Sequence, residues 1–166
     1  MSETTHTVAP WWRTRLAEIL PFLGHRNWIA VVDSAYPLQG GAGLEMQIAG
    51  EDMIATLEHL VSAIDASKHV AASIFVDAEL GDLVETDAPG ISAYRGSLDH
   101  LLRNRHVDAI PHEEIIGMIN DAAAKFHVLI LKTTFTLPYT SVFFRLECGY
   151  WDEEREGRLR SNTKTG

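Results

Sequence analysis

The sequence predicts an α/β fold, a three-layer sandwich with a largely parallel central sheet. Short apolar runs of strand length alternate along the chain with segments whose apolar residues recur every three or four positions, as in amphipathic helices. One of these runs, 28–32, is apolar at every position, which is typical of a parallel strand covered on both faces. Helices and strands that alternate in this way favour a parallel sheet with helices on both sides.

Local signals place each element. The first helix is expected over 11–23, with Pro21 distorting its last turn before Gly24 ends it. A second helix follows Gly50 and carries an apolar stripe that ends at Ile64. A third is expected over 91–102, and a fourth from Pro111 to 125, with proline and two glutamates in its first turn. Strands are expected at 28–32, 44–49, 70–76, 107–110, 127–131 and 141–146, and the acidic segment 77–90 as an irregular connection.

The length of 166 residues corresponds to one domain. Residues 1–10 are polar, and we expect them to form a disordered N-terminal segment. The folded domain is then expected to span 11–150. Residues 151–166 are rich in charge and are expected to form a solvated or frayed C-terminal tail.

Composition excludes several classes of function. Lys and Arg number 14 against 23 Asp and Glu, so the formal net charge is −9, and we expect no nucleic-acid partner. The sequence has neither an apolar run of spanning length nor a signal peptide, so we expect a cytoplasmic protein with no membrane partner. The single cysteine, Cys148, excludes an intrachain disulfide and a cysteine-rich metal site.

Position in the predicted fold singles out four polar residues. Asp33 ends the most apolar strand, where ligands gather in open α/β sheets, although aspartate is equally typical of turns. His112 lies in the first turn of a helix, where the dipole favours the neutral ring that can exchange protons near pH 7. His25 lies between a helix and a buried strand, and Tyr139 lies in the loop between the last two strands. Hydrogen-bonded structural roles for the histidines, and packing for the tyrosine, stay open.

Three segments resemble signatures of the ribose pyranase and fucose mutarotase family. Residues 24–37 read Gly-His, a polar pair, an apolar strand and Asp, with a proline shortly after. Residues 138–144 resemble the second signature, a tyrosine shortly before an apolar strand, and residues 110–114 resemble a helix start that bears a His or Arg. The order, the spacing and the length agree over about 11–150.

The resemblance implies a fold, an assembly and an activity. Members of the family have an α/β fold and assemble into ring-like homo-oligomers. They interconvert the anomers, or the pyranose and furanose forms, of a sugar such as fucose or ribose, and they need no cofactor or metal. Carried over residue by residue, His25 matches the family's proton donor, so the catalytic residues expected are His25 and Asp33. The substrate-binding residues expected are Asp33, His112, Tyr139, Thr140 and Ser141.

Two departures from the family pattern keep alternatives open. Ser141 replaces an asparagine of the second signature, and Asn27 replaces an acidic residue that follows the Gly-His pair. The first alternative is a non-catalytic sugar-binding or regulatory protein on the same scaffold, which would bind a sugar without accelerating its anomer exchange. The second is a different isomerase or lyase acting on a sugar acid or modified sugar. A metal enzyme is a distant third, because no ligand cluster is visible in the sequence.

Overall fold

The structure is a computed structural model that describes residues 10–163. Its helices are α1 (Trp11–Ile19), α2 (Met53–Ala66), α3 (Ile91–Leu101), α4 (His112–Ala123) and α5 (Glu153–Thr163), with short 3-10 helices η1 (Leu20–Phe22) and η2 (Ala78–Gly81). Its strands are β1 (Trp28–Val32), β2 (Leu44–Ile48), β3 (Val70–Asp77), β4 (Val107–Ile110), β5 (Val128–Lys132) and β6 (Val142–Cys148). The segment expected to be disordered, 1–10, lies outside the described residues except for Pro10, which precedes α1.

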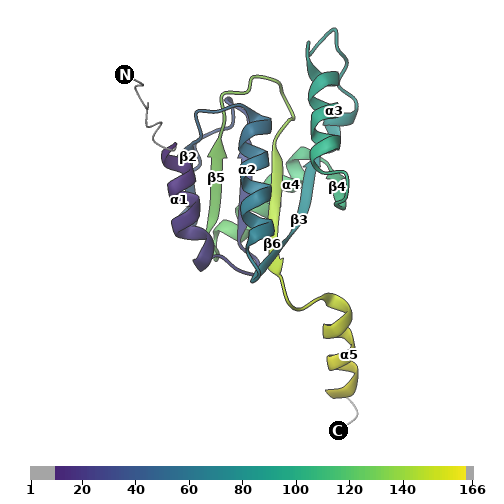
Figure 1. Cartoon of the computed structure of the whole chain (residues 1–166). Helices are drawn as coiled ribbons and strands as arrows, with labels where there is room; N and C mark the ends of the chain where they lie inside the picture. The colour runs from purple at the N-terminus through teal and green to yellow at the C-terminus, as the bar shows by residue number, and fades with distance from the viewer. Residues whose placement is uncertain (1–9, 164–166) are drawn as a thin grey trace, which may run out of the picture.

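The six strands form one sheet in the order β2-β5-β1-β6-β3-β4. Five of them run in the same direction, and β6 runs antiparallel between its neighbours β1 and β3. In Figure 1 the arrow of β5 points upward and that of β6 points downward. The largely parallel sheet expected from the sequence is therefore confirmed. The start of β6 and the ends of the other five strands meet at one edge, which we call the carboxyl edge.

Helices cover both faces of the sheet and give the three layers expected from the sequence (Figure 1). Alternate side chains of β1 face opposite ways: Ile29 and Val31 belong to the core under α1, α2 and α3, while Ala30 and Val32 belong to the core under α4. All five residues of β1 are buried, as its unbroken apolar run predicts.

Two prolines set helix boundaries close to the expected positions. The helix expected over 11–23 is α-helical only to Ile19 and then tightens into η1, which contains Pro21. A proline has no N–H to donate to the preceding turn, so the predicted distortion of the last turn is confirmed. Pro111 precedes α4 as its N-cap, which makes His112 the first helical residue.

The charged tail, expected to be solvated or frayed, is solvated but helical. It forms the helix α5, which buries no residue and projects away from the sheet in Figure 1. The Asp152 side chain accepts the N–H of Arg155 at 2.8 Å, and Arg160 pairs with Glu156 four residues earlier at 2.6 Å. Such caps and i,i+4 pairs stabilise a helix that has no apolar face. No helix within residues 10–163 is long and apolar enough to span a membrane.

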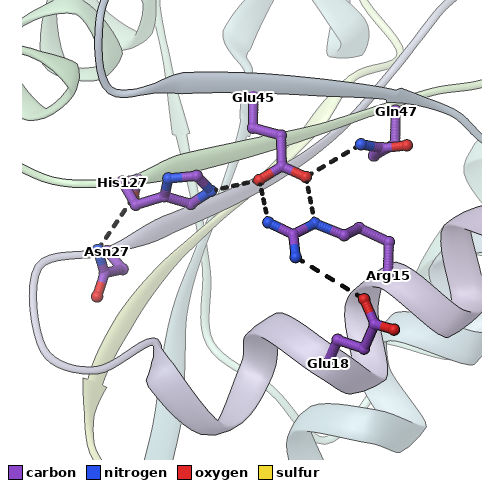
Figure 2. Close-up of polar contacts among 6 residues, drawn as sticks. All are labelled: Arg15, Glu18, Asn27, Glu45, Gln47 and His127. Carbon is purple, nitrogen blue, oxygen red and sulfur yellow. Dashed lines mark hydrogen bonds and ion pairs between the residues drawn. The ribbon is translucent and has the colours of Figure 1, made fainter.

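A polar network joins α1 to the amino ends of β2, β5 and β1, and Figure 2 shows its side chains. The Glu45 carboxylate on β2 accepts hydrogen bonds from Arg15 Nε at 2.6 Å and Nη2 at 2.8 Å. It also accepts one from Gln47 at 3.0 Å and lies 2.9 Å from Nε2 of His127. Asn27 donates to the His127 carbonyl at 3.1 Å. The bonds from Arg15 hold the pKa of Glu45 at about 2.

Candidate functional site

The carboxyl edge gathers polar side chains from four strands. Asp33 follows β1, Asp77 ends β3, and His112 follows β4. Because β6 runs in the opposite direction, the residues before it, Tyr139 and Ser141, reach the same edge. Five of the six site residues expected from the sequence therefore lie at the place where parallel α/β sheets bind ligands: Asp33, His112, Tyr139, Thr140 and Ser141.

A histidine and a buried carboxylate form the centre of this edge. His112 Nδ1 lies 3.0 Å from Oδ1 of Asp77, whose side chain is only 1% exposed. The parallel pairing of β3 with β4 places Asp77 opposite Ile110, two residues before His112. The carboxylate of Glu79 accepts the backbone N–H of His112 at 3.1 Å, which satisfies a free donor at the start of α4. Neighbouring groups of one strand–turn segment thus fix both the backbone and the ring of His112.

Burial changes the electrostatics of this edge. It raises the pKa of Asp77, against the hydrogen bond to His112, which lowers it. Burial also raises the pKa of Tyr36 to about 12, and the charges of Asp77 and Asp33 add to that effect. The two aspartates and the tyrosine therefore influence one another across the end of the sheet.

Tyr139 lies beside His112 with a strained backbone. The two rings meet edge to face, with centroids 5.6 Å apart and planes at 86°. The φ angle of Tyr139 is 55°, in the left-handed region that residues other than Gly, Asn and Asp seldom adopt. The side chain is nevertheless 39% exposed, so its ring and hydroxyl can meet a ligand. Strain of this kind is found at functional sites more often than elsewhere.

The remaining residues of this edge are engaged inside the chain. Asp33 accepts the N–H of Ala35 at 2.8 Å, which is the turn chemistry that the sequence left open, and its other oxygen lies 3.5 Å from the Ser141 hydroxyl. Thr140 and Ser141 are buried. The Thr140 hydroxyl donates to the carbonyl of Leu137 at 2.7 Å, so a substrate contact of Thr140 stays a prediction.

His25 lies at the opposite edge of the sheet from Asp33. It precedes β1, whereas Asp33 follows it, and the five residues of that strand span about 16 Å. His25 Nδ1 lies 2.9 Å from Glu147 near the end of β6, and the ring is more than half exposed. Within one chain, the two residues expected to be catalytic therefore do not meet.

Asp77 and Glu79 were not among the residues that sequence reasoning singled out. Asp77 falls in the segment 77–90 that the sequence predicts as an acidic connection, although it ends an apolar strand, much as Asp33 follows one. Applied to both strands, the same argument would have found it. Asn27, where the family carries an acidic residue, accepts the N–H of Gly24 at 2.8 Å and is a turn residue here.

The side chains of this edge can bind and exchange protons with a polar ligand. Carboxylates accept hydroxyl hydrogens, an imidazole both gives and takes a proton, and an aromatic ring packs against C–H surfaces. Among residues 10–163 no three His, Cys, Asp or Glu side chains converge in a way that could hold a metal ion.

Comparison with known proteins gives the fold but no relative in sequence. No protein-family model matches the chain, and no curated protein matches it. The structure is similar to that of Bacillus subtilis RbsD in complex with D-ribose, with a TM-score of 0.57 and 18% identity over 92% of this chain and 100% of that one. It is also similar to the fucose mutarotase from Streptococcus pneumoniae in complex with L-fucose, with a TM-score of 0.53 and 16% identity over the same shares. FucU from Bifidobacterium longum matches with a TM-score of 0.51 and 13% identity over 84% of this chain and 96% of that one. The chain therefore has the fold that its sequence signatures imply.

Proposed function

We propose that this protein is a cytoplasmic monosaccharide mutarotase or pyranase that interconverts ring forms of a sugar such as ribose or fucose. The observation that carries the proposal is the group of Asp33, His112 and Tyr139 at the carboxyl edge, matching three of the expected sugar contacts. Two solved structures of the same fold hold sugars, D-ribose and L-fucose, which supports this class of ligand.

The reaction needs few groups. A base takes the proton of the anomeric hydroxyl while an acid protonates the ring oxygen, and the open-chain aldehyde closes again on its other face or on another hydroxyl. This exchange already occurs in water, so general acid–base help of about 10²–10⁴-fold is sufficient. Asp33 would hold a sugar hydroxyl, and Tyr139 would pack against the C–H surface of the ring.

His25 enters this proposal only through assembly. Because it lies at the other edge of its own sheet, it could protonate a sugar beside Asp33 only if a second copy presented it there. The ring-like homo-oligomer that the resemblance implies would have to bring His25 of one copy to Asp33 of the next. We therefore propose self-association together with the activity, and sedimentation at micromolar concentration tests it, with a monomer as the result against it.

NMR exchange spectroscopy of anomeric protons tests the function. Ribose, fucose, galactose and glucose would each be measured with and without the protein. Faster exchange for one sugar supports the proposal and identifies the substrate. Resonance shifts or line broadening without faster exchange would favour the sugar-binding alternative. The observation that favours this alternative is the separation of His25 from Asp33 within one chain.

Two variants locate the activity. His25→Ala tests the role implied by the resemblance, and unchanged exchange would remove His25 from the mechanism while leaving the function in place. His106→Gln is a matched surface control, because His106 is 86% exposed and precedes β4 at its other end. Its exchange rate should equal that of the unmodified protein.

A further inference from the structure

The pairing of Asp77 with His112 resembles the base–orienter pairs that activate histidines in enzymes. An ionised carboxylate can only accept hydrogen bonds, so Nδ1 of His112 carries the proton that faces Oδ1 of Asp77 at 3.0 Å. In the neutral ring the lone pair then lies on Nε2. No residue within 10–163 is bonded to Nε2, and the side chain is 29% exposed, so this nitrogen is open to a ligand.

The Asp77 side chain is also incompletely satisfied. Its second oxygen, Oδ2, is buried and has no hydrogen-bond partner among the residues that the structure describes. An unsatisfied buried acceptor destabilises the folded state, and such groups in folded proteins are found at catalytic or strained sites. A purely structural role would be served as well by an asparagine or by an apolar residue of the same shape.

Resting on the proposed function, we propose that Asp77 is a positioning residue that holds His112 as the proton-accepting group of the sugar site. The base is then His112, which the sequence predicts only to bind the substrate. It lies in the same chain as the rest of the site and acts without His25. Asp77 does not touch the sugar. It fixes the orientation and the protonated nitrogen of the ring, and it stabilises the imidazolium that forms during the reaction.

The proton balance closes within the residues of this edge. Nε2 of His112 takes the proton of the anomeric hydroxyl, whose O–H electron pair becomes the second bond of the aldehyde. The bond between the anomeric carbon and the ring oxygen breaks with its electron pair going to that oxygen. The oxygen takes a proton from the hydroxyl of Tyr139, the ring that contacts His112. After rotation at the anomeric carbon the same transfers run in reverse, so both side chains regain their starting states.

The first test reads the protonated nitrogen of His112 directly and does not depend on activity. In protein labelled with ¹⁵N-histidine, the ring nitrogens of neutral His112 should show the proton on Nδ1, with the signal assigned by its loss in His112→Gln. His106 is the internal contrast, because its Nε2 faces Asp108 at 2.8 Å and therefore Nε2, not Nδ1, should carry the proton. A His112 ring that carries its proton on Nε2 would overturn the proposal.

The second test measures exchange kinetics in Asp77→Asn. The substitution keeps the shape and removes the charge, so kcat should fall about 10–100-fold while KM changes less than about threefold. Asp77→Glu keeps the charge and should recover part of kcat. The control is Asp108→Asn, in the exposed pair with His106, and its kcat should equal that of the unmodified protein.

An Asp77→Asn protein with unchanged kcat would overturn the role of Asp77 while leaving the proposed mutarotase activity in place. An unmodified protein that accelerates no sugar would instead overturn the proposed function, and this role with it. Because a buried aspartate can be needed for folding, the tautomer of the unmodified protein decides the pairing if Asp77→Asn does not fold.

Discussion

Replacing Glu45 by glutamine should destabilise the protein by an amount that depends on pH. The hydrogen bonds from Arg15 lower the pKa of Glu45 from 4.5 to about 2. By proton linkage, lowering the pKa of this carboxyl group by about 2.5 in the folded state corresponds to about 3.4 kcal/mol of stability. Because the side chains of Arg15 and Glu45 are 29% and 18% exposed, solvent screens the pair, and we expect about 1–2 kcal/mol.

The sign follows from the direction of the shift. A carboxyl group whose folded-state pKa is depressed contributes its full stability above its ordinary pKa and loses it as the pH falls through the folded value. The free energy of unfolding of Glu45→Gln should therefore lie about 1–2 kcal/mol below that of the unmodified protein at pH 7. The gap should narrow between about pH 5 and pH 2.

Urea unfolding followed by circular dichroism at several pH values measures this gap. Glu18→Gln is the matched control, because Glu18 approaches Arg15 only to 3.9 Å and is 58% exposed. We expect the control to change stability by less than about 0.5 kcal/mol. A gap for Glu45→Gln that stays constant down to pH 2.5, or that does not exceed the control, would refute the reasoning.

Three further predictions concern backbone geometry and the tail. A Cβ at Gly43 would collide with the carbonyl oxygens of Ala123 and Phe126, so Gly43→Ala should cost about 2–3 kcal/mol in urea unfolding. Gly96 lies in open space on the exposed face of α3, so Gly96→Ala should gain up to about 1 kcal/mol, and equal effects of the two substitutions would contradict this. Tyr139→Gly relieves a backbone strain of about 1 kcal/mol, so its thermal midpoint should not fall although sugar affinity measured by NMR titration should; a large loss of stability would show that the ring is structural. Deletion of residues 153–166 removes a helix that buries nothing, so the unfolding free energy should change by less than about 0.5 kcal/mol, and a larger loss would mean that α5 packs on something in solution.

Much of the fold could be predicted because its signals are local. The apolar run of β1, the proline in η1 and the stripe of α2 each determine a short segment through burial or backbone chemistry. The helix α5 was missed because it has no apolar stripe. Its stability comes from an aspartate cap and from charge pairs, such as Glu156 with Arg160, that the same composition also allows in an unfolded tail.

The site was predicted only in part because its geometry is not local. The strand-end rule found Asp33, but the contact between Asp77 and His112 depends on the register that pairs β3 with β4. The separation of His25 from Asp33 depends on the direction of a single strand, which a signature of consecutive residues does not reveal. The resemblance gave residue types in the right order, while the sheet decides which of them share an edge.

The place of β6 has a consequence for synthesis of the chain on the ribosome. It is the last strand along the described chain, yet it lies between β1 and β3 and provides the link between the two parallel groups of the sheet. Until residues 142–148 emerge, β2, β5 and β1 can pair with one another, and so can β3 with β4, but each group keeps an unpaired inner edge. Nascent sheets with open edges are prone to aggregate, and pairings this distant in sequence form slowly. We therefore expect translation stalled before residue 142 to yield chains that depend on chaperones, and chains released after residue 150 to fold without that dependence.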